Sequence, residues 1–140
     1  MLALEDVTPE NYAEATLLAV APEQRHLVSP VVASLADCPR VAREDGGRLV
    51  GFVLAYPFTW EGRPVVNIVR FLVDQKHQGR GLGRELLQAT LAWWRAETPR
   101  PARFRVTTKV ENARAEHVFR SCGFSGDDVV RGERVLWRDA

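Results

Sequence analysis

Hydrophobic residues recur along the chain at two spacings, which predict strands and helices in turn. Leu2 and Leu4 lie two apart and predict a first strand. The sequence Thr8-Pro9-Glu10 predicts a helix start, with Thr8 as N-cap and Pro9 in the first turn, where its missing N–H is not needed. The residues expected on the apolar side of this helix are Ala13, Leu17, Leu18 and Val20.

Ser29-Pro30 repeats the start signal and predicts a short second helix over residues 31–36, which Cys38-Pro39 ends.

The middle of the chain predicts three successive antiparallel strands. They cover residues 40–43, 48–56 and 65–73, and the second is apolar nearly throughout, which is typical of a central strand. Asp45-Gly46-Gly47 predicts the first connecting turn because its glycines accept positive φ, and residues 61–64 predict the second.

A long helix over residues 81–97 comes next. Its apolar residues spread wider than a single stripe, so we expect burial on more than one side. The elements expected after it are a strand over 104–107, a helix over 111–121 with Gly123 as C-cap, and a final hairpin of 129–130 with 134–137. This order predicts an α/β fold of the mixed, α+β kind, in which helices cover a mixed sheet.

Composition narrows the class of protein. The chain has 140 residues and 15.7 kDa, enough for one domain, and its 46% apolar and 26% charged residues are typical of a folded globular protein. Nineteen basic residues against 18 acidic ones give a net charge of +1, which argues against nucleic acid held by bulk electrostatics. No apolar run approaches the roughly 18 residues that a membrane span needs.

The N-terminus, the cysteines and the histidines bear on location and metal content. The first six residues lack the basic start and apolar stretch of a secretory leader, so we expect a cytoplasmic protein. Cys38 and Cys122 make neither a disulfide framework nor a C-x-x-C site. His26, His77 and His117 lack the spacing of metal ligands, and we expect no metal.

The segment Gln78-Gly79-Arg80-Gly81-Leu82-Gly83 carries the clearest chemical signal. It joins a predicted strand to a predicted helix, whose first N–H groups and dipole favour an anion. Its glycines let the backbone turn sharply and let a bulky phosphate approach. Arg84-Glu85 replaces the Lys-Ser/Thr ending of the phosphate loop, and the dinucleotide fingerprint needs glycine where Arg84 stands. A tight turn without a ligand remains the alternative.

Gln78-x-x-Gly81-x-Gly83 after a strand resembles the pyrophosphate-binding motif of the GNAT superfamily of acetyl-CoA-dependent N-acetyltransferases. A second block, Asn112-x-x-Ala115-x-x-x-Phe119-x-x-x-Gly123-Phe124, is similar to the late helix motif of that superfamily. The element order matches as well, so the resemblance extends over residues 1–140 as a single N-acetyltransferase domain. It implies a mostly antiparallel sheet, splayed at the acyl-CoA site and flanked by helices.

The resemblance also implies how acetyl-CoA is held. Backbone N–H groups of the glycine segment would bind the pyrophosphate, and the strand ending at Leu72 and Val73 would splay from its parallel neighbour and pair with the pantetheine arm. The Val73 N–H would polarise the acetyl carbonyl. Arg80 and Arg84 would reach phosphates or remain solvated. The residues assigned to the cofactor are Leu72, Val73, Gln78, Gly79, Arg80, Gly81, Leu82, Gly83, Arg84, Asn112 and Phe119.

The second block has an interpretation of its own. Asn112, Ala115, Phe119 and Cys122 share one helical stripe, and a small alanine beside an amide suits a narrow ligand arm. The alternative is that the last three are ordinary core and that Asn112 only caps the helix. The family commonly has tyrosine, the proposed acid for the CoA thiolate, where Phe119 stands. Cys122 and Tyr56 are the replacement donors considered, besides water.

No nucleophile–base pair is readable, which favours direct attack of an acceptor amine on the thioester. The carboxylates considered for base and amine binding are Glu23, Glu61 and Asp74. Residues 70–74 and 29–36 resemble bacterial diamine and polyamine acetyltransferases, so the acceptor is expected to be a small-molecule amine, with a polyamine as one candidate.

Three alternatives stay open. In the first, the chain binds CoA with little or no catalysis. In the second, it acetylates a protein N-terminus or lysine. In the third, it is a dimerisation domain without a ligand. By resemblance alone, a homodimer is the expected assembly.

Overall fold

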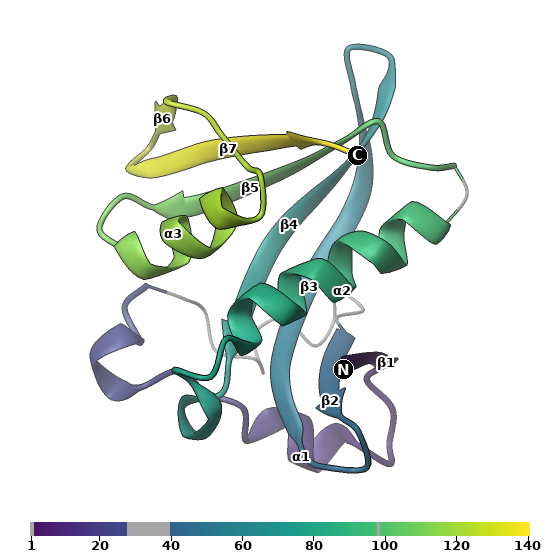
Figure 1. Ribbon diagram of the computed structural model, residues 1–140, viewed down its shortest axis with the longest axis vertical. Coiled ribbons are helices and arrows are strands. Elements are labelled where there is room, and N and C mark those ends of the chain that lie inside the picture. Colours follow the sequence, from purple (N-terminus) through teal and green to yellow (C-terminus); the bar gives the residue numbers. More distant parts are fainter. Residues whose placement is uncertain (1, 28–39, 98) are drawn as a thin grey trace.

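The computed structural model describes residues 2–27, 40–97 and 99–140, and these residues form a seven-stranded sheet with helices on both faces (Figure 1). The spatial order of the strands is β1-β2-β3-β4-β5-β7-β6, and every neighbouring pair is antiparallel except β4 and β5. The strands are β1 Leu2–Asp6, β2 Arg40–Glu44, β3 Leu49–Trp60, β4 Arg63–Val73, β5 Arg103–Lys109, β6 Val129–Val130 and β7 Glu133–Asp139. The mixed sheet and the three successive antiparallel strands predicted from the sequence are confirmed.

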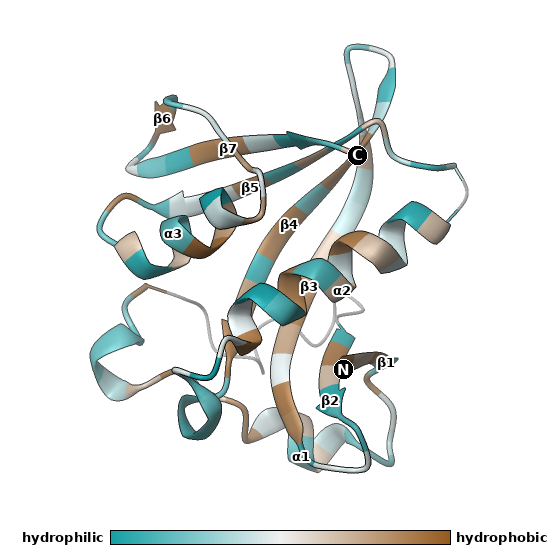
Figure 2. Ribbon diagram, viewed as in Figure 1, coloured by the Kyte–Doolittle hydropathy of each residue, from teal (hydrophilic) through white to brown (hydrophobic). Residues whose placement is uncertain are grey.

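The sheet separates the core into two apolar clusters, one on each face, and helices pack on both. Leu86 of α2 and Phe119 of α3 belong to the first cluster, and Ala15 of α1 belongs to the second. Figure 2 shows hydrophobic stretches along β3, β4 and β7, the strands that carry much of this burial. The helices are α1 Tyr12–Thr16, α2 Leu82–Ala96 and α3 Ala113–Ser121, with 3-10 turns η1 Pro22–Gln24 and η3 Gln75–His77.

The first helix begins later than the sequence predicted. Its N-cap is Asn11, not Thr8, because the Asn11 side chain folds back and accepts a hydrogen bond from the Thr8 N–H at 2.8 Å. The apolar side was also wrong in part: Ala13 and Leu17 are exposed, and the buried positions are Ala15, Leu18 and Val20. The second predicted helix, over 31–36, lies outside the described residues, as does Cys38.

The long helix and the last helix end much as predicted. The buried residues of α2 are Leu82, Leu86, Leu87, Thr90 and Leu91, and the helix packs against β1 and β4 of the sheet and against α3. Gly123, at φ +90°, follows α3 in the conformation of a C-capping glycine. The Gly123 N–H donates to the Arg120 carbonyl and the Phe124 N–H to the Phe119 carbonyl, the two bonds of a Schellman motif.

The parallel pair at the centre of the sheet is short. Pairing of β4 with β5 extends from Val65 opposite Arg103 to Ile68 opposite Val106, whereas β4 continues to Val73 and β5 to Lys109. Figure 1 shows the two strands diverging beyond that point. The sheet is therefore splayed between β4 and β5, as the resemblance implied.

A β-bulge in β4 lies where the splay begins. Leu54 of β3 faces Arg70 and Ala55 faces Ile68, so Val69 is the extra residue of β4. Ile68 and Phe71 both pack in the cluster under α2 although they are three residues apart. The bulge accordingly leaves Val69 and Arg70 together on the opposite face.

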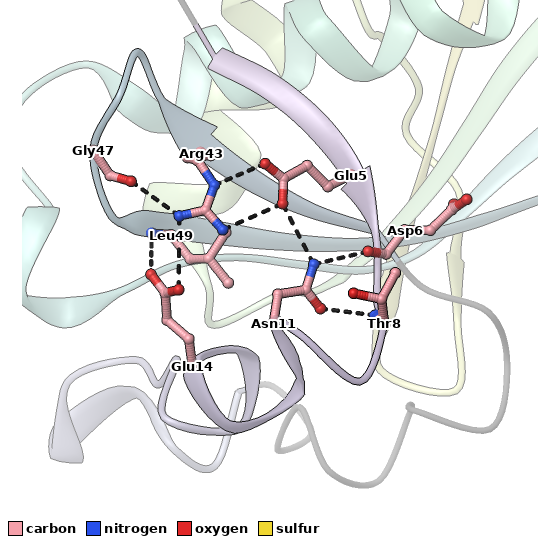
Figure 3. Close-up of polar contacts among 8 residues, drawn as sticks. All are labelled: Glu5, Asp6, Thr8, Asn11, Glu14, Arg43, Gly47 and Leu49. Atoms are coloured by element: carbon pink, nitrogen blue, oxygen red, sulfur yellow. Dashed lines mark hydrogen bonds and ion pairs between the residues drawn. The ribbon is translucent and has the colours of Figure 1, made fainter.

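A polar cluster joins the sheet edge to α1 (Figure 3). Arg43 of β2 donates to Glu5 of β1, with an Nε–Oε1 distance of 2.7 Å, and to the Gly47 carbonyl. Asn11 donates to the Asp6 carbonyl at 2.9 Å, and Glu14 accepts from the Leu49 N–H at 2.8 Å. The hydrogen bond from Arg43 holds the pKa of Glu5 below its usual range.

We expect Glu5→Gln to lower the free energy of unfolding near pH 7 by about 0.5–1 kcal/mol, the range for a partly exposed ion pair. Because the folded-state pKa is the lower one, this stabilisation is complete above the unfolded pKa, about 4.3, and is lost as the pH falls through the folded value. Urea denaturation from pH 7 to pH 3 should show the two proteins converging at low pH. A matched Glu10→Gln variant, at an exposed position, should follow the wild type throughout. A constant Glu5→Gln deficit down to pH 3 would contradict the assignment.

Candidate functional site

The glycine segment between η3 and α2 has the backbone shape that its sequence predicted. Gly79 and Gly81 have φ of +80° and +76°, and Gly81 is the N-cap of α2. A Cβ atom built on either glycine meets no other atom within 4 Å, so both face open space. The turn thus leaves room in front of the first N–H groups of α2, which carry the positive end of the helix dipole.

That open space is part of a cavity of about 310 Å³. The end of β4, the start of α2 and one side of α3 form its walls, together with residues in and next to η1. Its lining residues are Val20, Gln24, Leu27, Phe71, Leu72, Val73, Gln78, Gly79, Gly81, Leu82, Gly83, Arg84, Asn112, Arg114, Ala115, His117, Val118 and Ser121. We call it the loop cavity.

The free edge of β4 borders this cavity. The Asp74 N–H donates to the Val50 carbonyl, so by the alternation of an antiparallel ladder Leu72 also pairs with β3, opposite Phe52. Phe71 and Val73 then direct their N–H and C=O groups away from β3, to the side where β5 has diverged. The Gln78 side chain agrees with this direction, because its Nε2 donates to the Val73 carbonyl at 3.0 Å.

A second cavity, of about 260 Å³, lies at the splay itself, and we call it the splay cavity. It shares Leu27, Phe71, Leu72, Asn112 and Ala115 with the loop cavity, so the two are neighbours with common walls. Its remaining lining residues are His26, Ile68, Val69, Arg70, Val106, Thr107, Thr108, Lys109, Phe119 and Glu133.

Nine of the eleven residues assigned to the cofactor line the loop cavity, and Arg80 and Phe119 do not. Arg80 forms an ion pair with Glu44 and contacts the His77 ring at 3.1 Å. Phe119 is 2% exposed and packs edge-on against Phe71, and it borders the splay cavity instead.

Asn112 caps α3 and also lines both cavities. Its Oδ1 accepts from the Ala115 N–H at 3.2 Å. Among the described residues its Nδ2 has no hydrogen-bond partner.

The two candidate proton donors lie away from the cavities. Tyr56 lies opposite Asn67 in the far half of the β3–β4 hairpin and is 45% exposed. Cys122 is the C-cap of α3, packs against the core, and has its Sγ 3.9 Å from the Ser121 Oγ. Neither lines either cavity.

The three candidate carboxylates are also absent from the described walls of the loop cavity and the splay cavity. Glu23 is exposed in η1, and Glu61 lies at the exposed tip of the β3–β4 hairpin. Asp74 is 7% exposed and accepts from the Ala19 N–H at 3.1 Å, so it ties the segment after α1 to the end of β4.

The sequence interpretation missed Glu133, the one carboxylate that lines the splay cavity among the described residues. It lies opposite Lys109 in the β5–β7 pairing, close in space to Asn112 although far from it in sequence. The closing hairpin was predicted, but only its register with β5 brings Glu133 to the site. Arg114, which lines the loop cavity, was missed as well.

The described ranges hold no candidate for a membrane span or a metal centre. No helix there is long and apolar enough to span a membrane. No group of three or more His, Cys, Asp or Glu side chains in those ranges is arranged to hold a metal ion.

Comparison with known proteins gives the family. A model of the acetyltransferase (GNAT) family matches residues 29–124. No curated protein sequence is similar enough to count as a match.

Solved structures share the fold. An acetyltransferase from Thermus thermophilus is 22% identical with a TM-score of 0.75, covering 100% of this chain and 97% of that one. Arabidopsis thaliana Naa50 in complex with the bisubstrate analogue CoA-Ac-MVNAL is 16% identical with a TM-score of 0.68, covering 99% of each chain. A spermidine N-acetyltransferase SpeG chimera from Vibrio cholerae and hSSAT is 16% identical with a TM-score of 0.72, covering 99% of this chain and 95% of that one.

We expect Asp74→Ala to lower the free energy of unfolding by about 1–3 kcal/mol, because the Ala19 N–H loses its acceptor in a mostly buried place. Asp74→Asn keeps an oxygen at that position and should retain most of the stability. Equilibrium urea denaturation of both variants measures the difference. An Asp74→Ala protein as stable as the wild type would show that the carboxylate has no structural role.

Proposed function

The chain belongs to the acetyltransferase (GNAT) family, and from that premise we propose that it transfers the acetyl group of acetyl-CoA to a primary amine of a small molecule. The observation that carries the proposal is the loop cavity, where an open glycine turn at the start of α2 meets the free edge of β4. A Cβ atom would fill the space in front of Gly79 and Gly81, so these residues suit a bulky anion.

In this proposal the backbone N–H groups of residues 78–83 hold the pyrophosphate of CoA. Arg84 and Arg114 line the same cavity and supply positive charge, whereas Arg80 is already paired with Glu44. The pantetheine arm pairs with the β4 edge as an added strand does, through the backbone of Phe71 and Val73. The resemblance implied that Leu72 also pairs with the arm. The ladder alternation instead directs the backbone groups of Leu72 to β3. The Asn112 Nδ2 is available to the amide groups of the arm.

The chemical step is direct attack of the acceptor nitrogen on the thioester carbon. A nitrogen–carbon bond forms, the carbon–sulfur bond breaks, and the sulfur leaves as thiolate. The Val73 N–H stabilises the negative charge on the carbonyl oxygen in the tetrahedral state. Glu133, at the splay cavity, removes the ammonium proton directly or through water. Phe119 has no proton to give, so water protonates the thiolate in this scheme.

The acceptor enters through the splay cavity, which shares walls with the loop cavity at the end of β4. A spermidine acetyltransferase and an enzyme bound to a peptide-based bisubstrate analogue have the same fold, so the fold alone does not choose the acceptor. Glu133 is the one carboxylate on the described walls of the splay cavity. A polycation would need several carboxylates to balance its positive charges. We therefore propose a small-molecule primary amine and do not extend the proposal to a polyamine or a protein.

Two further expectations remain predictions. A homodimer would use an exposed surface such as β6, an edge strand whose Val129 and Val130 are 49% and 55% exposed. A cytoplasmic location is the second of these predictions.

Release of free CoA thiol tests the proposed reaction. We expect the protein with acetyl-CoA to release thiol in proportion to an added primary amine, followed with a thiol-reactive chromogenic reagent. Mass spectrometry should find the acetylated amine in equal amount. Tight CoA binding, measured by calorimetry, with no amine-dependent release would contradict the proposal and favour the CoA-binding module without catalysis.

Gly81→Val tests the glycine turn. The new side chain fills the open space before α2, and we expect the Kd for CoA to rise at least about tenfold, measured by titration calorimetry. Gly46→Val is the matched control, because Gly46 also has positive φ, +61°, and open space, but lies in the β2–β3 turn. Both variants suffer similar backbone strain. Equal CoA affinity in the two variants would contradict the loop assignment.

A further inference from the structure

The splay cavity has an uneven distribution of charge. Four ionisable side chains line it among the described residues: Arg70, Lys109, Glu133 and His26. Lys109 and Glu133 lie opposite each other across the β5–β7 pairing, and the Lys109 Nζ donates to the His26 carbonyl. On the described walls the cavity therefore has two positive side chains, Arg70 and Lys109, against the single carboxylate of Glu133.

Arg70 is a partly buried guanidinium group without a carboxylate partner among the described residues. Its Nη1 donates to the neighbouring Val69 carbonyl at 3.1 Å, and its Nε is buried with no hydrogen-bond partner there. Within the described ranges, six other arginines pair with carboxylates within 4.0 Å: Arg40, Arg43, Arg80, Arg103, Arg120 and Arg134. Burying a guanidinium group away from water without a hydrogen-bond partner destabilises the folded protein. An anion bound in the cavity would supply that partner and offset the cost.

The β4 bulge explains why an arginine lies there. In an unbulged strand, residue 70 would project to the same face as Ile68, into the apolar cluster under α2. The extra residue Val69 keeps Arg70 on the opposite face, where it lines the splay cavity. The strand that would bind the cofactor arm therefore also presents the arginine to the acceptor cavity.

We infer that the acceptor amine also carries a carboxylate, which the Arg70 guanidinium binds in the splay cavity. This inference rests on the proposed function and names its substrate class: an amino acid or a similarly small amino-carboxylate. One guanidinium balances one monoanion, and its planar fork matches a carboxylate. The hydroxyls of Thr107 and Thr108, on the β5 wall, are further donors for the anion. Glu133 remains for the ammonium end.

The same charges disfavour a polyamine. A diamine or triamine would bring two or three positive charges into a cavity that already holds Arg70 and Lys109, against Glu133 alone on the described walls. Like charges at close range in a partly desolvated cavity repel strongly. The cavity volume, about 260 Å³, also suits a small molecule better than a folded protein segment.

A panel of matched acceptors tests the inference. Thiol release from acetyl-CoA is measured with α-, β- and ω-amino acids, with the corresponding amino amides, and with putrescine and spermidine. Each acid and its amide differ only in the charge at the far end. We expect a higher kcat/KM for the acids than for the amides. Arg70→Gln should reduce this acid-over-amide ratio about 10- to 100-fold, the effect of losing a charge-assisted hydrogen bond.

Two further variants separate charge from structure. Arg70→Lys keeps the positive charge and should retain part of the acid preference. Arg105→Gln makes the same change on β5, where Arg105 contacts Asn67 and lines neither cavity, and should keep the ratio of the wild type.

The outcomes distinguish the two proposals. Equal rates for acids and amides, a preference for spermidine, or an acid preference that survives Arg70→Gln would overturn the carboxylate inference and leave the acetyltransferase proposal standing. If no acceptor in the panel causes thiol release, the proposed function is contradicted. In that case calorimetric titration of the protein–CoA complex with the same acids and amides decides the role of Arg70. Tighter binding of the acids that is lost in Arg70→Gln supports an anion site, and equal binding overturns it.

Discussion

The arrangement of the candidate site depends on how early the two parallel strands separate. Pairing of β4 with β5 ends at Ile68 opposite Val106, while β3 continues to hold β4 as far as Val73. Beyond Ile68, β3 thus holds β4 on one side, while the N–H groups of Phe71 and Val73 are directed away from β3. An unpaired strand edge is an energetic liability in a folded protein unless something occupies it. Here the edge is bordered by two cavities, and a ligand that adds as a strand would satisfy it.

Much of the fold could be predicted from the sequence because its signals are local. The glycines at positions 79, 81 and 123 mark backbone turns that need positive φ, and each lies where its spacing predicted. The start of α1 could not be predicted in the same way, because the Thr8-Pro9 signal competes with Asn11. The Asn11 side chain bonds to both the Thr8 N–H and the Asp6 carbonyl, and it moves the helix start three residues along the chain.

The candidate site likewise has one part that local sequence motifs predict and one part that they do not. The residues for an anion and a narrow ligand arm lie in two contiguous motifs, and nine of the eleven assigned residues line the loop cavity. The acceptor side comes from residues distant in sequence: Arg70 through a bulge, and Glu133 through the register of β7 with β5. The contact of Asp74 with the Ala19 N–H could not be predicted, because its loop position gives no sign that a residue 55 positions away would reach it. Non-local pairing, not residue type, decides which carboxylate faces the cavity.

The central claim is that the open edge of β4 and the turn before α2 together bind coenzyme A. Titration of the isotope-labelled protein with CoA, followed by the backbone amide signals in a two-dimensional NMR spectrum, measures this residue by residue. We predict the largest changes at the amides of Phe71, Val73 and residues 79–83. Unchanged signals at these positions, or changes confined to the β1–β2–α1 side of the molecule, would contradict it.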